Sequence, residues 1–226
     1  MKRQQFAIIG LGRFGSAMAT TLAGLGQDVI GVDAEEEPVR RLADVVTQAI
    51  ELDATDERAL RTAGIQNVDV AVVSIGENIE SSLLVVMQLR EIGIKTIVAK
   101  AVTPLHGRIL EKLGVSRVVF PEREMAVRLA HSLVVPNALD YIELSHDFSI
   151  VELTAPEQFV GRTLKQIELR PRFGLTLLAI KRRPSSTTPE VTTVAPSADE
   201  MIRRDDVLAL LGSNERLNEF DTILKQ

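Results

Sequence analysis

Residues 10–15 read Gly-Leu-Gly-Arg-Phe-Gly, and this short stretch decides the fold of the N-terminal half of the chain. An apolar run at residues 5–9 precedes it and is short enough for a buried strand. A helical stretch follows at residues 16–25 and ends at Gly26. A strand, a G-x-G-x-x-G turn and a helix in this order are typical of a nucleotide-binding βα unit.

Each glycine of this motif has its own physical role. Gly10 permits the tight turn, Gly12 lets a phosphate approach the backbone, and Gly15 lets the helix pack close to the strand. Asp33 ends the next apolar run, 18 residues after Gly15, near the spacing of about 20 at which an acidic residue accepts ribose hydroxyls. Because free N–H groups and the helix dipole face such a ligand, we predict a nucleotide above this turn. A glycine turn without a ligand is the alternative.

Arg13 lies inside the motif, at a position where small or apolar residues are more usual. Its guanidinium can donate to phosphate oxygens through its forked N–H groups. A solvated surface arginine is the alternative interpretation. Taken alone, Arg13 indicates a ligand with additional charge on a terminal phosphate.

Composition limits the class of protein. The 226 residues suffice for one large or two small domains. Aromatic residues make up only 4% of the chain, so aliphatic packing dominates, as in buried parallel sheets. The net charge of −5 argues against a general nucleic-acid surface. The absence of cysteine excludes thiolate nucleophiles, cysteine-ligated zinc and disulfides, and it suits a reducing cytoplasm.

The chain shows no targeting or membrane-spanning pattern. Its first strand begins almost at the N-terminus, so we expect no signal peptide. No apolar run approaches the ~20 residues that a membrane span needs. We therefore expect any membrane role to depend on a partner.

Short apolar runs alternate with helical segments up to about residue 120. This alternation predicts right-handed βαβ crossovers and a Rossmann-like, doubly wound parallel sheet. The expected strands are 5–10, 28–33, 47–51, 70–74, 95–99 and 117–120, with helices at about 14–25, 35–43, 56–63, 79–92 and 104–113.

Ligands on such a sheet lie at the carboxyl ends of its strands, and the loops there carry suggestive residues. Asp53 and Thr55 could contact an adenine edge, or Thr55 could belong to the cap of the next helix. Gly76 allows a close backbone approach, or it forms an ordinary turn. Lys100 is a suitable phosphate neighbour. Glu122 suits a cation that bridges it to phosphate, or it satisfies a helix dipole.

The second half of the chain has a different organisation. Residues 122–135 predict an amphipathic crossover helix that could form a dimer contact or pack on its own sheet. Beyond it we expect a small α+β unit. Its expected strands are 148–154, 174–181 and 206–211, with helices at 161–168 and 214–224. A Pro/Ser/Thr-rich segment, 184–197, predicts a mobile hairpin loop. We place one domain at residues 1–138 and the other at 139–226.

The residues for hydride transfer are missing. Tyr141 is the only tyrosine, and Ser145 stands four positions after it, so the Tyr-x-x-x-Lys pair is absent. The sequence contains neither a G-x-S-x-G elbow nor an H-E-x-x-H motif, and its three histidines lack metal-ligand spacing. We therefore predict a sensor that binds a nucleotide without transforming it. An NAD(P)-dependent oxidoreductase is an alternative from another class.

Several segments recur together in one family. They are Ile-Gly-Leu-Gly-Arg-Phe-Gly (9–15), Asp33, Ser-Ile-Gly (74–76), Ala-Lys-Ala (99–101), Ile-Leu-Glu-Lys-Leu-Gly (109–114), Phe-Pro-Glu-Arg-Glu-Met (120–125) and Leu-Asp-Tyr-Ile-Glu-Leu (139–144). Over nearly its whole length the chain resembles the regulator-of-potassium-conductance (RCK) subunits of bacterial Ktr and Trk potassium uptake systems, the KtrA type most of all.

The resemblance implies a Rossmann-like N-terminal domain and a smaller C-terminal domain. It implies homodimers that assemble into an octameric ring beneath an integral-membrane potassium-translocating subunit of the KtrB or TrkH type. The protein would then be cytoplasmic and peripheral to the inner face of the cell membrane. ATP and ADP would compete for the N-terminal site, with ATP activating. An NAD(H)-responsive regulatory subunit of the Trk type is the alternative.

The resemblance also implies roles for individual residues. Arg13 would meet the terminal phosphate of ATP, and Asp33 the ribose. His106 would lie near the phosphates, although a lone histidine is also common in packing, and Glu122 would help to hold a Mg, Ca or Na ion there across the dimer. The implied N-terminal site comprises Gly10, Gly12, Arg13, Phe14, Gly15, Asp33, Ala34, Glu35, Asp53, Ala54, Thr55, Ile75, Gly76, Glu77, Lys100, Ala101, His106 and Glu122. In the C-terminal domain, Leu164, Arg170 and Pro196 match the region where some relatives bind cyclic di-AMP.

Overall fold

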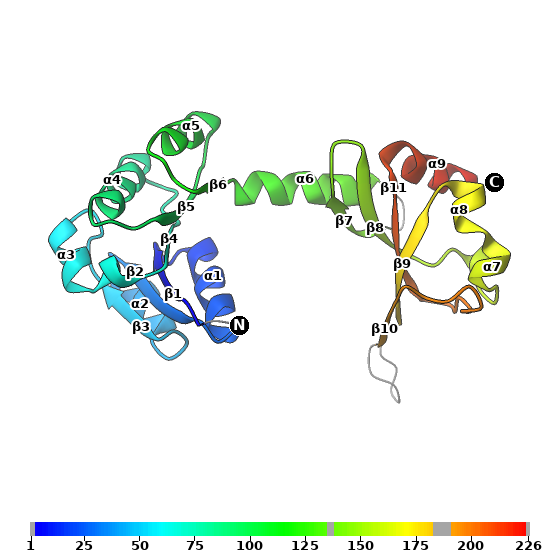
Figure 1. Ribbon diagram of the computed structural model, residues 1–226, viewed down its shortest axis with the longest axis horizontal. Helices are drawn as coiled ribbons and strands as arrows, with labels where there is room; N and C mark the ends of the chain where they lie inside the picture. Colours follow the sequence, from blue (N-terminus) through cyan, green and yellow to red (C-terminus); the bar gives the residue numbers. More distant parts are fainter. Residues whose placement is uncertain (1–2, 135–137, 183–190, 225–226) are drawn as a thin grey trace. The chain divides into compact units, whose positions relative to one another are not determined.

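The computed structural model describes residues 3–134, 138–182 and 191–224 (Figure 1). The chain divides into two compact units, Met1–Pro121 and Glu122–Gln226, each with its own sheet and core. Our domain boundary at residue 138 stays a prediction. Within the described ranges, no helix is both long enough and apolar enough to cross a lipid bilayer.

The first unit is a parallel sheet of six strands with helices in its crossovers. The strands are β1 (Gln5–Ile9), β2 (Asp28–Asp33), β3 (Gln48–Glu51), β4 (Val70–Val73), β5 (Thr96–Lys100) and β6 (Arg117–Val119). The helices are α1 (Arg13–Gly24), α2 (Glu36–Leu42), α3 (Glu57–Thr62), α4 (Ile79–Glu91) and α5 (Pro104–Lys112). The strand order is β3-β2-β1-β4-β5-β6, so the direction of winding reverses between β1 and β4. The predicted doubly wound sheet is confirmed.

Two apolar clusters cover the two faces of this sheet. Neighbouring residues of a strand point to opposite faces, so Ile8 clusters with Ala19 of α1 while Ile9 clusters with Val85 of α4. Both isoleucines are buried. Burial on both faces explains why β1 and β4 are almost uninterrupted apolar runs rather than alternating ones.

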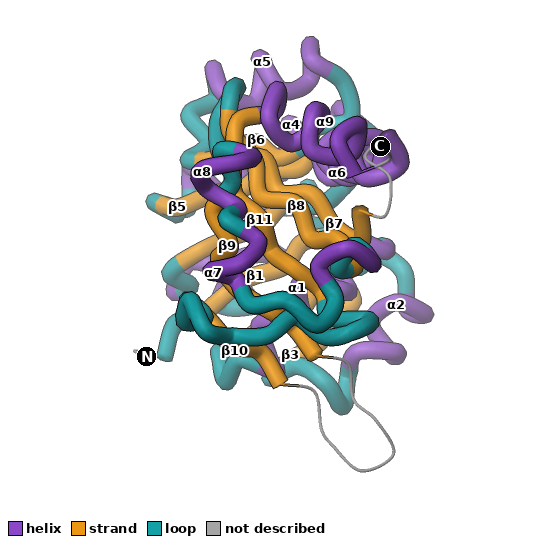
Figure 2. Tube along the Cα trace, turned by 90° about the vertical axis from the view of Figure 1, so that its right-hand side faces the viewer, coloured by secondary structure: helices purple, strands orange, loops and turns teal. Residues whose placement is uncertain are grey.

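The second unit is built on an antiparallel sheet of five strands, in the order β10-β9-β11-β8-β7. Figure 2 shows β9, β11, β8 and β7 running side by side. The strands are β7 (Ala138–Glu143), β8 (Phe148–Thr154), β9 (Thr176–Arg182), β10 (Val191–Val194) and β11 (Val207–Ser213). The helices are α6 (Pro121–Val134), α7 (Leu164–Ile167), α8 (Leu169–Phe173) and α9 (Asn214–Leu224).

The second core lies where α7, α8 and α9 pack on this sheet (Figure 1). Phe173 of α8 lies edge-on to Phe220 of α9, with ring centroids 5.1 Å apart, and Phe159 completes an aromatic trio. Such pairs contribute about 0.5–1.5 kcal/mol each beyond their buried area. The predicted α+β architecture is therefore present, with its helices anchored by three of the few aromatic residues.

Two local predictions in this unit are wrong. The segment 184–197, predicted as a loop, contains strand β10, whose Val-Thr-Thr-Val sequence pairs with β9. Its β-branched residues favour an extended chain, and this outweighs the flanking Pro and Ser. The loop residues 183–190 lie outside the described residues. The helix predicted at 161–168 is only Leu164–Ile167, because Thr163 caps its start and Glu168 ends it with a left-handed φ of 55°. Strand β7 was not predicted.

Two glycines of α1 provide a test of the packing. A Cβ on Gly15 would lie 1.9 Å from the Gly10 carbonyl oxygen, whereas a Cβ on Gly24 would meet nothing within 4 Å. We predict that Gly15→Ala lowers the free energy of unfolding by about 1–3 kcal/mol through overpacking. Gly24→Ala should raise it by about 0.5–1 kcal/mol, because alanine loses less backbone entropy in a helix. Urea denaturation of the full chain measures both, and equal stabilities for the two variants would contradict the packing described here.

Candidate functional site

The loops after β1 and β4 meet where the strand order reverses. Gly10 follows β1, and a Cβ on it would lie 3.2 Å from both the Ile75 nitrogen and Ser74 Oγ. Ser74 Oγ donates to the Gly10 carbonyl, and Gly10 N–H donates to the Val32 carbonyl at 2.8 Å. The turn is thus held by both strands that flank β1. Ligands of doubly wound sheets bind in the crevice at this reversal.

Gly12 and Gly15 have opposite surroundings. Gly15 is buried against the Gly10 carbonyl and tolerates no Cβ. Gly12 is exposed, has an ordinary φ of −64°, and has open space where a Cβ would lie. It occupies the N-cap position of α1, and no side chain caps that helix. The fold therefore explains Gly15, while the open space at Gly12 fits a phosphate at the start of the helix.

Asp33, at the carboxyl end of β2, braces the same turn. Its Oδ2 accepts a hydrogen bond from Leu11 N–H at 2.5 Å, and its Oδ1 accepts one from Glu35 N–H at 3.0 Å. A carboxylate oxygen can accept two hydrogen bonds, so each oxygen keeps a lone pair for a ribose hydroxyl. The structural role of Asp33 is therefore compatible with its predicted binding role.

Lys100 brings a positive charge to the loop after β4. A Cβ on Gly76 would lie 3.3 Å from Lys100 Nζ and 3.4 Å from Val102 Cγ1. The ammonium group therefore lies beside Gly76, at the carboxyl edge of the sheet. Ile75 is half-buried in the same loop, and Glu77 is exposed.

Asp53 and Thr55 form a turn that leads into α3. Thr55 N–H and Thr55 Oγ1 both donate to Asp53 Oδ1, at 2.9 and 2.7 Å. The Thr55 hydroxyl, and next the Thr55 N–H, lower the pKa of the Asp53 carboxyl. Asp56 caps α3 by accepting from Arg58 N–H at 2.8 Å. The cap is therefore Asp56 and not Thr55, while contacts of Asp53, Thr55 and the buried Ala54 with adenine stay predictions.

His106 is only 1% exposed. Its Nδ1 faces Val102 N–H at 3.5 Å, and its buried Nε2 has no hydrogen-bond partner among the described residues. Burial lowers the pKa of His106 and so favours the neutral ring. Its place near the phosphates stays a prediction.

The remaining candidates lie on the same loops or just beyond them. Arg13 is exposed on the first turn of α1, and Phe14 beside it is half-buried. Ala101 is buried, and Ala34 and Glu35 are exposed after β2. Glu122 lies in the first turn of α6 and belongs to the second compact unit, so its membership of the site stays a prediction.

A metal site is not formed by the described side chains alone, since no three of their His, Asp or Glu groups converge. A cation at Glu122 would therefore take further ligands from elsewhere, as phosphate oxygens could provide. Ser74, which links β4 to the glycine turn, was not among our site candidates. The sequence does contain a signal that could have identified Ser74, because this polar residue directly follows the four apolar residues of β4.

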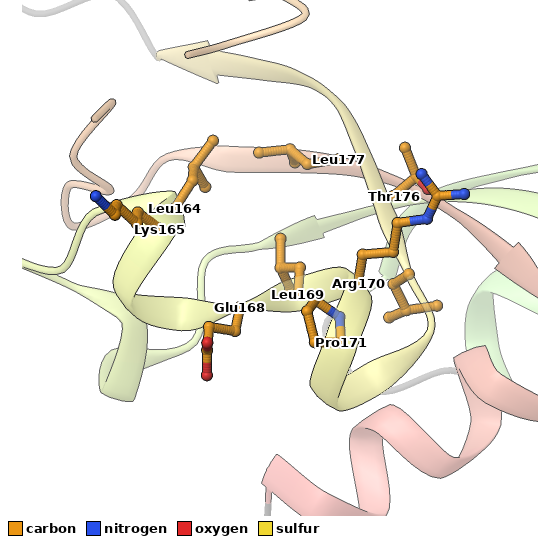
Figure 3. A pocket seen from close by; sticks show the side chains of 9 residues that line it. Leu164, Lys165, Glu168, Leu169, Arg170, Pro171, Thr176 and Leu177 are labelled. Carbon is orange, nitrogen blue, oxygen red and sulfur yellow. The ribbon is translucent and has the colours of Figure 1, made fainter. Parts of the chain in front are cut away.

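A cavity of about 390 Å³ lies in the second unit (Figure 3). Leu164, Leu169 and Leu177 point into it, with Lys165 and Arg170 toward opposite ends in this view. Its lining residues are Leu164, Lys165, Glu168, Leu169, Arg170, Pro171, Leu175, Thr176 and Leu177. Two of the three residues predicted for a second ligand, Leu164 and Arg170, are therefore together, while Pro196 is not in the lining. The lining residues of β9 were missed because only the fold brings that strand to α7 and α8.

Known proteins show what this chain is similar to. The TrkA-N domain model matches residues 6–121, and the TrkA-C domain model matches residues 148–225. Ktr system potassium uptake protein C of Bacillus subtilis is 38% identical over 219 residues, which cover 97% of this chain and 96% of that protein. Ktr system potassium uptake protein A of the same organism is 37% identical over 221 residues, covering 98% and 97%.

Solved structures support the same fold. The GsuK RCK domain matches with a TM-score of 0.66 at 18% sequence identity. The match covers 100% of this chain and 48% of the GsuK chain. The GsuK channel bound to NAD has a TM-score of 0.65 at 18% identity, and this chain spans 40% of it. The predicted resemblance is confirmed by the family models and by the two Bacillus relatives. The chain therefore belongs to the family of Ktr and Trk potassium uptake proteins, which combine a TrkA-N with a TrkA-C domain.

Proposed function

We propose that this protein is a nucleotide-sensing regulatory subunit that gates a membrane potassium transporter, with ATP and ADP competing for the first unit. The observation that carries this proposal is a glycine turn braced from two strands, with open space at Gly12 beside an uncapped helix start. The near full-length similarity to two Ktr proteins supports the link to potassium uptake. The partner would be an integral-membrane subunit of the KtrB or TrkH type, with this chain at the inner face of the membrane.

The residues of the chain would bind and orient the nucleotide. Asp33 would accept the ribose hydroxyls, and the first turn of α1 would donate to the phosphates. Arg13 and Lys100 would supply positive charge, and Glu122 would hold a Mg, Ca or Na ion against the phosphates. The ion would neutralise phosphate charge.

ATP must favour the activating state of the subunit more than ADP does. A nucleotide that bound both states with equal affinity would not shift the equilibrium between them. The γ-phosphate is the chemical difference between them, and Arg13 is the group we assign to it. Coupling free energies of this kind are about 1–3 kcal/mol per site. In an octameric ring, several such sites would act together.

We propose that the nucleotide is bound and not consumed. The single tyrosine, Tyr141, is buried, and its hydroxyl is hydrogen-bonded to Ser149 Oγ at 2.6 Å. Ser149 Oγ also lies 2.7 Å from Asn214 Oδ1 at the start of α9. Tyr141 therefore has a structural role and is not presented to a substrate as a proton donor.

We further propose that α6 is a homodimer contact from which the ring is assembled. Met125, Leu129 and Leu133 lie on α6 and are 58%, 55% and 76% exposed. Their spacing of four residues places them along one face of the helix. An apolar stripe of this kind is typical of a helix that packs against a second helix.

NAD(H) is the alternative ligand. Asp33 suits the ribose of any adenine nucleotide, and the GsuK channel, which shares the fold, is described as bound to NAD. Calorimetric titration of the protein with ATP, ADP and NADH separates the two. NADH binding without ATP or ADP binding would favour the alternative.

We predict that Gly12→Ala lowers the free energy of unfolding by no more than about 1 kcal/mol, the usual cost of alanine at an N-cap. It should weaken ATP and ADP binding about tenfold or more, because its methyl group would occupy the space that the phosphate needs. Calorimetry measures the affinities and urea denaturation the stability. Gly24→Ala, in the same helix and also in open space, is the control and should bind normally. If Gly12→Ala bound ATP and ADP with wild-type affinity, the glycine turn would have a structural role only.

Arg13→Ala should lower the affinity for ATP more than that for ADP, since only ATP offers the γ-phosphate. Arg13→Lys should recover part of the loss, because it keeps the charge without the forked donors. Affinities of both nucleotides and nucleotide-dependent potassium flux with the membrane partner are the measurements. Full activation of Arg13→Ala by ATP over ADP would remove Arg13 from the trigger.

For the second unit we propose that cyclic di-AMP binds in the cavity of Figure 3 against Leu164 and Arg170, and that Pro196 contacts the ligand from outside the cavity lining. The apolar lining suits purine rings, and Lys165 and Arg170 suit phosphates. We predict that Arg170→Ala lowers the affinity for cyclic di-AMP about tenfold or more. Arg172→Ala is the matched control. Arg172 does not line the cavity, and its Cζ lies 5.2 Å from the centroid of the Phe173 ring. Equal affinities of the two variants would contradict this site.

A further inference from the structure

Helix α5 touches the segment after β6 through a glycine. Gly107 is buried, and a Cβ on it would lie 2.6 Å from Cζ of Phe120 and 3.4 Å from its Cε1 and Cε2. The tip of the phenylalanine ring is therefore directed at the backbone of α5. Gly107 does not have a left-handed φ, so the ring, and not the backbone conformation, requires glycine here.

The loop between β5 and α5 is held on both sides of this contact. Ala101 N–H donates to the Val119 carbonyl at 2.8 Å, directly before Phe120. Gly107 N–H donates to the Thr103 carbonyl at 3.0 Å, which fixes the first turn of α5. The loop, the start of α5 and the end of β6 therefore form one packed block.

Predicted ligand residues lie on both ends of this block. Lys100 and His106 belong to the β5–α5 segment that surrounds the ring contact. From Phe120 the chain passes directly into α6 at Pro121, and Glu122 follows. Proline fixes its own φ and is favoured in the first turn of a helix, so α6 begins directly after Phe120.

Close packing passes displacements on instead of absorbing them, and the space beside Gly107 cannot hold even a methyl group. We propose that the Gly107–Phe120 contact couples nucleotide occupancy of the β5–α5 segment to the first turn of α6. In this proposal Phe120 is a positioning residue that acts on Glu122 through the start of α6. This inference rests on the proposed function, because it takes a nucleotide in the first unit as the signal.

The absence of cysteine from the chain makes a direct readout possible. The variant Arg123→Cys carries a single spin label on the exposed side of the first turn of α6 in the full-length protein. The label spectrum is recorded with saturating ATP and with saturating ADP, and calorimetry gives the affinity for each nucleotide. Phe120→Leu removes the ring tip that meets Gly107 and keeps an apolar side chain.

Phe6→Leu is the matched control. Phe6 is half-buried like Phe120 and lies in the same unit, but it packs with the cluster of α1 and α2, whereas Phe120 packs with that of α4 and α5. Both substitutions remove comparable packing. If Phe120 had only a structural role, the two variants would therefore show the same difference between their label spectra with ATP and with ADP.

We expect Phe120→Leu to reduce the spectral difference between ATP and ADP about fivefold or more, the size of a typical coupling, while its ADP affinity changes less than about threefold. Phe6→Leu should keep the difference. A wild-type difference in Phe120→Leu, or an equal loss in both variants, would overturn the inference. If Phe120→Leu folds poorly, Phe120→Met is judged by the same criteria. Failure of the wild-type protein to bind either nucleotide would overturn the proposed function, and this inference with it, before any variant is compared.

Discussion

The turn after β1 is held by hydrogen bonds from both neighbouring strands, and the rest of the candidate site depends on this. Asp33 accepts from Leu11 N–H on one side, and Ser74 Oγ donates to the Gly10 carbonyl on the other. Gly15 packs against that same carbonyl, which places α1 directly above the strand. Because the chain itself supplies the contacts that hold the turn, a nucleotide would bind with little cost for ordering the loop.

The two units have separate cores and different candidate sites. The first places glycine turns and Lys100 at one edge of a parallel sheet, whereas the second has an open pocket lined by α7, α8 and β9. A regulatory protein must connect such sites to a response through elements with two arrangements. In this chain the covalent connection between the two units runs from Phe120 through Pro121 into α6.

Most of the first unit could be predicted from the sequence. Strands buried on both faces require apolar runs, and the crossovers require helices of known spacing, so every strand appears within about a residue or two of its expected place. The second unit was harder, because its strands are partly exposed and carry weaker patterns. Strand β10 lies within a segment whose Pro and Ser content indicated a loop, and it forms because β9 is there to pair with it.

The sequence by itself determined the βα turn, the candidate ligand residues at the strand ends and the family, since turn chemistry and hydrophobic periodicity are properties of neighbouring residues. Only the tertiary structure decided which glycines are required by packing. Gly15 is confined by Gly10 and Gly107 by Phe120, whereas Gly12 faces open space. It also decided that His106 is buried and that Leu164 and Arg170 line one cavity with Leu177. These facts depend on contacts between segments distant in the chain, which no local pattern specifies.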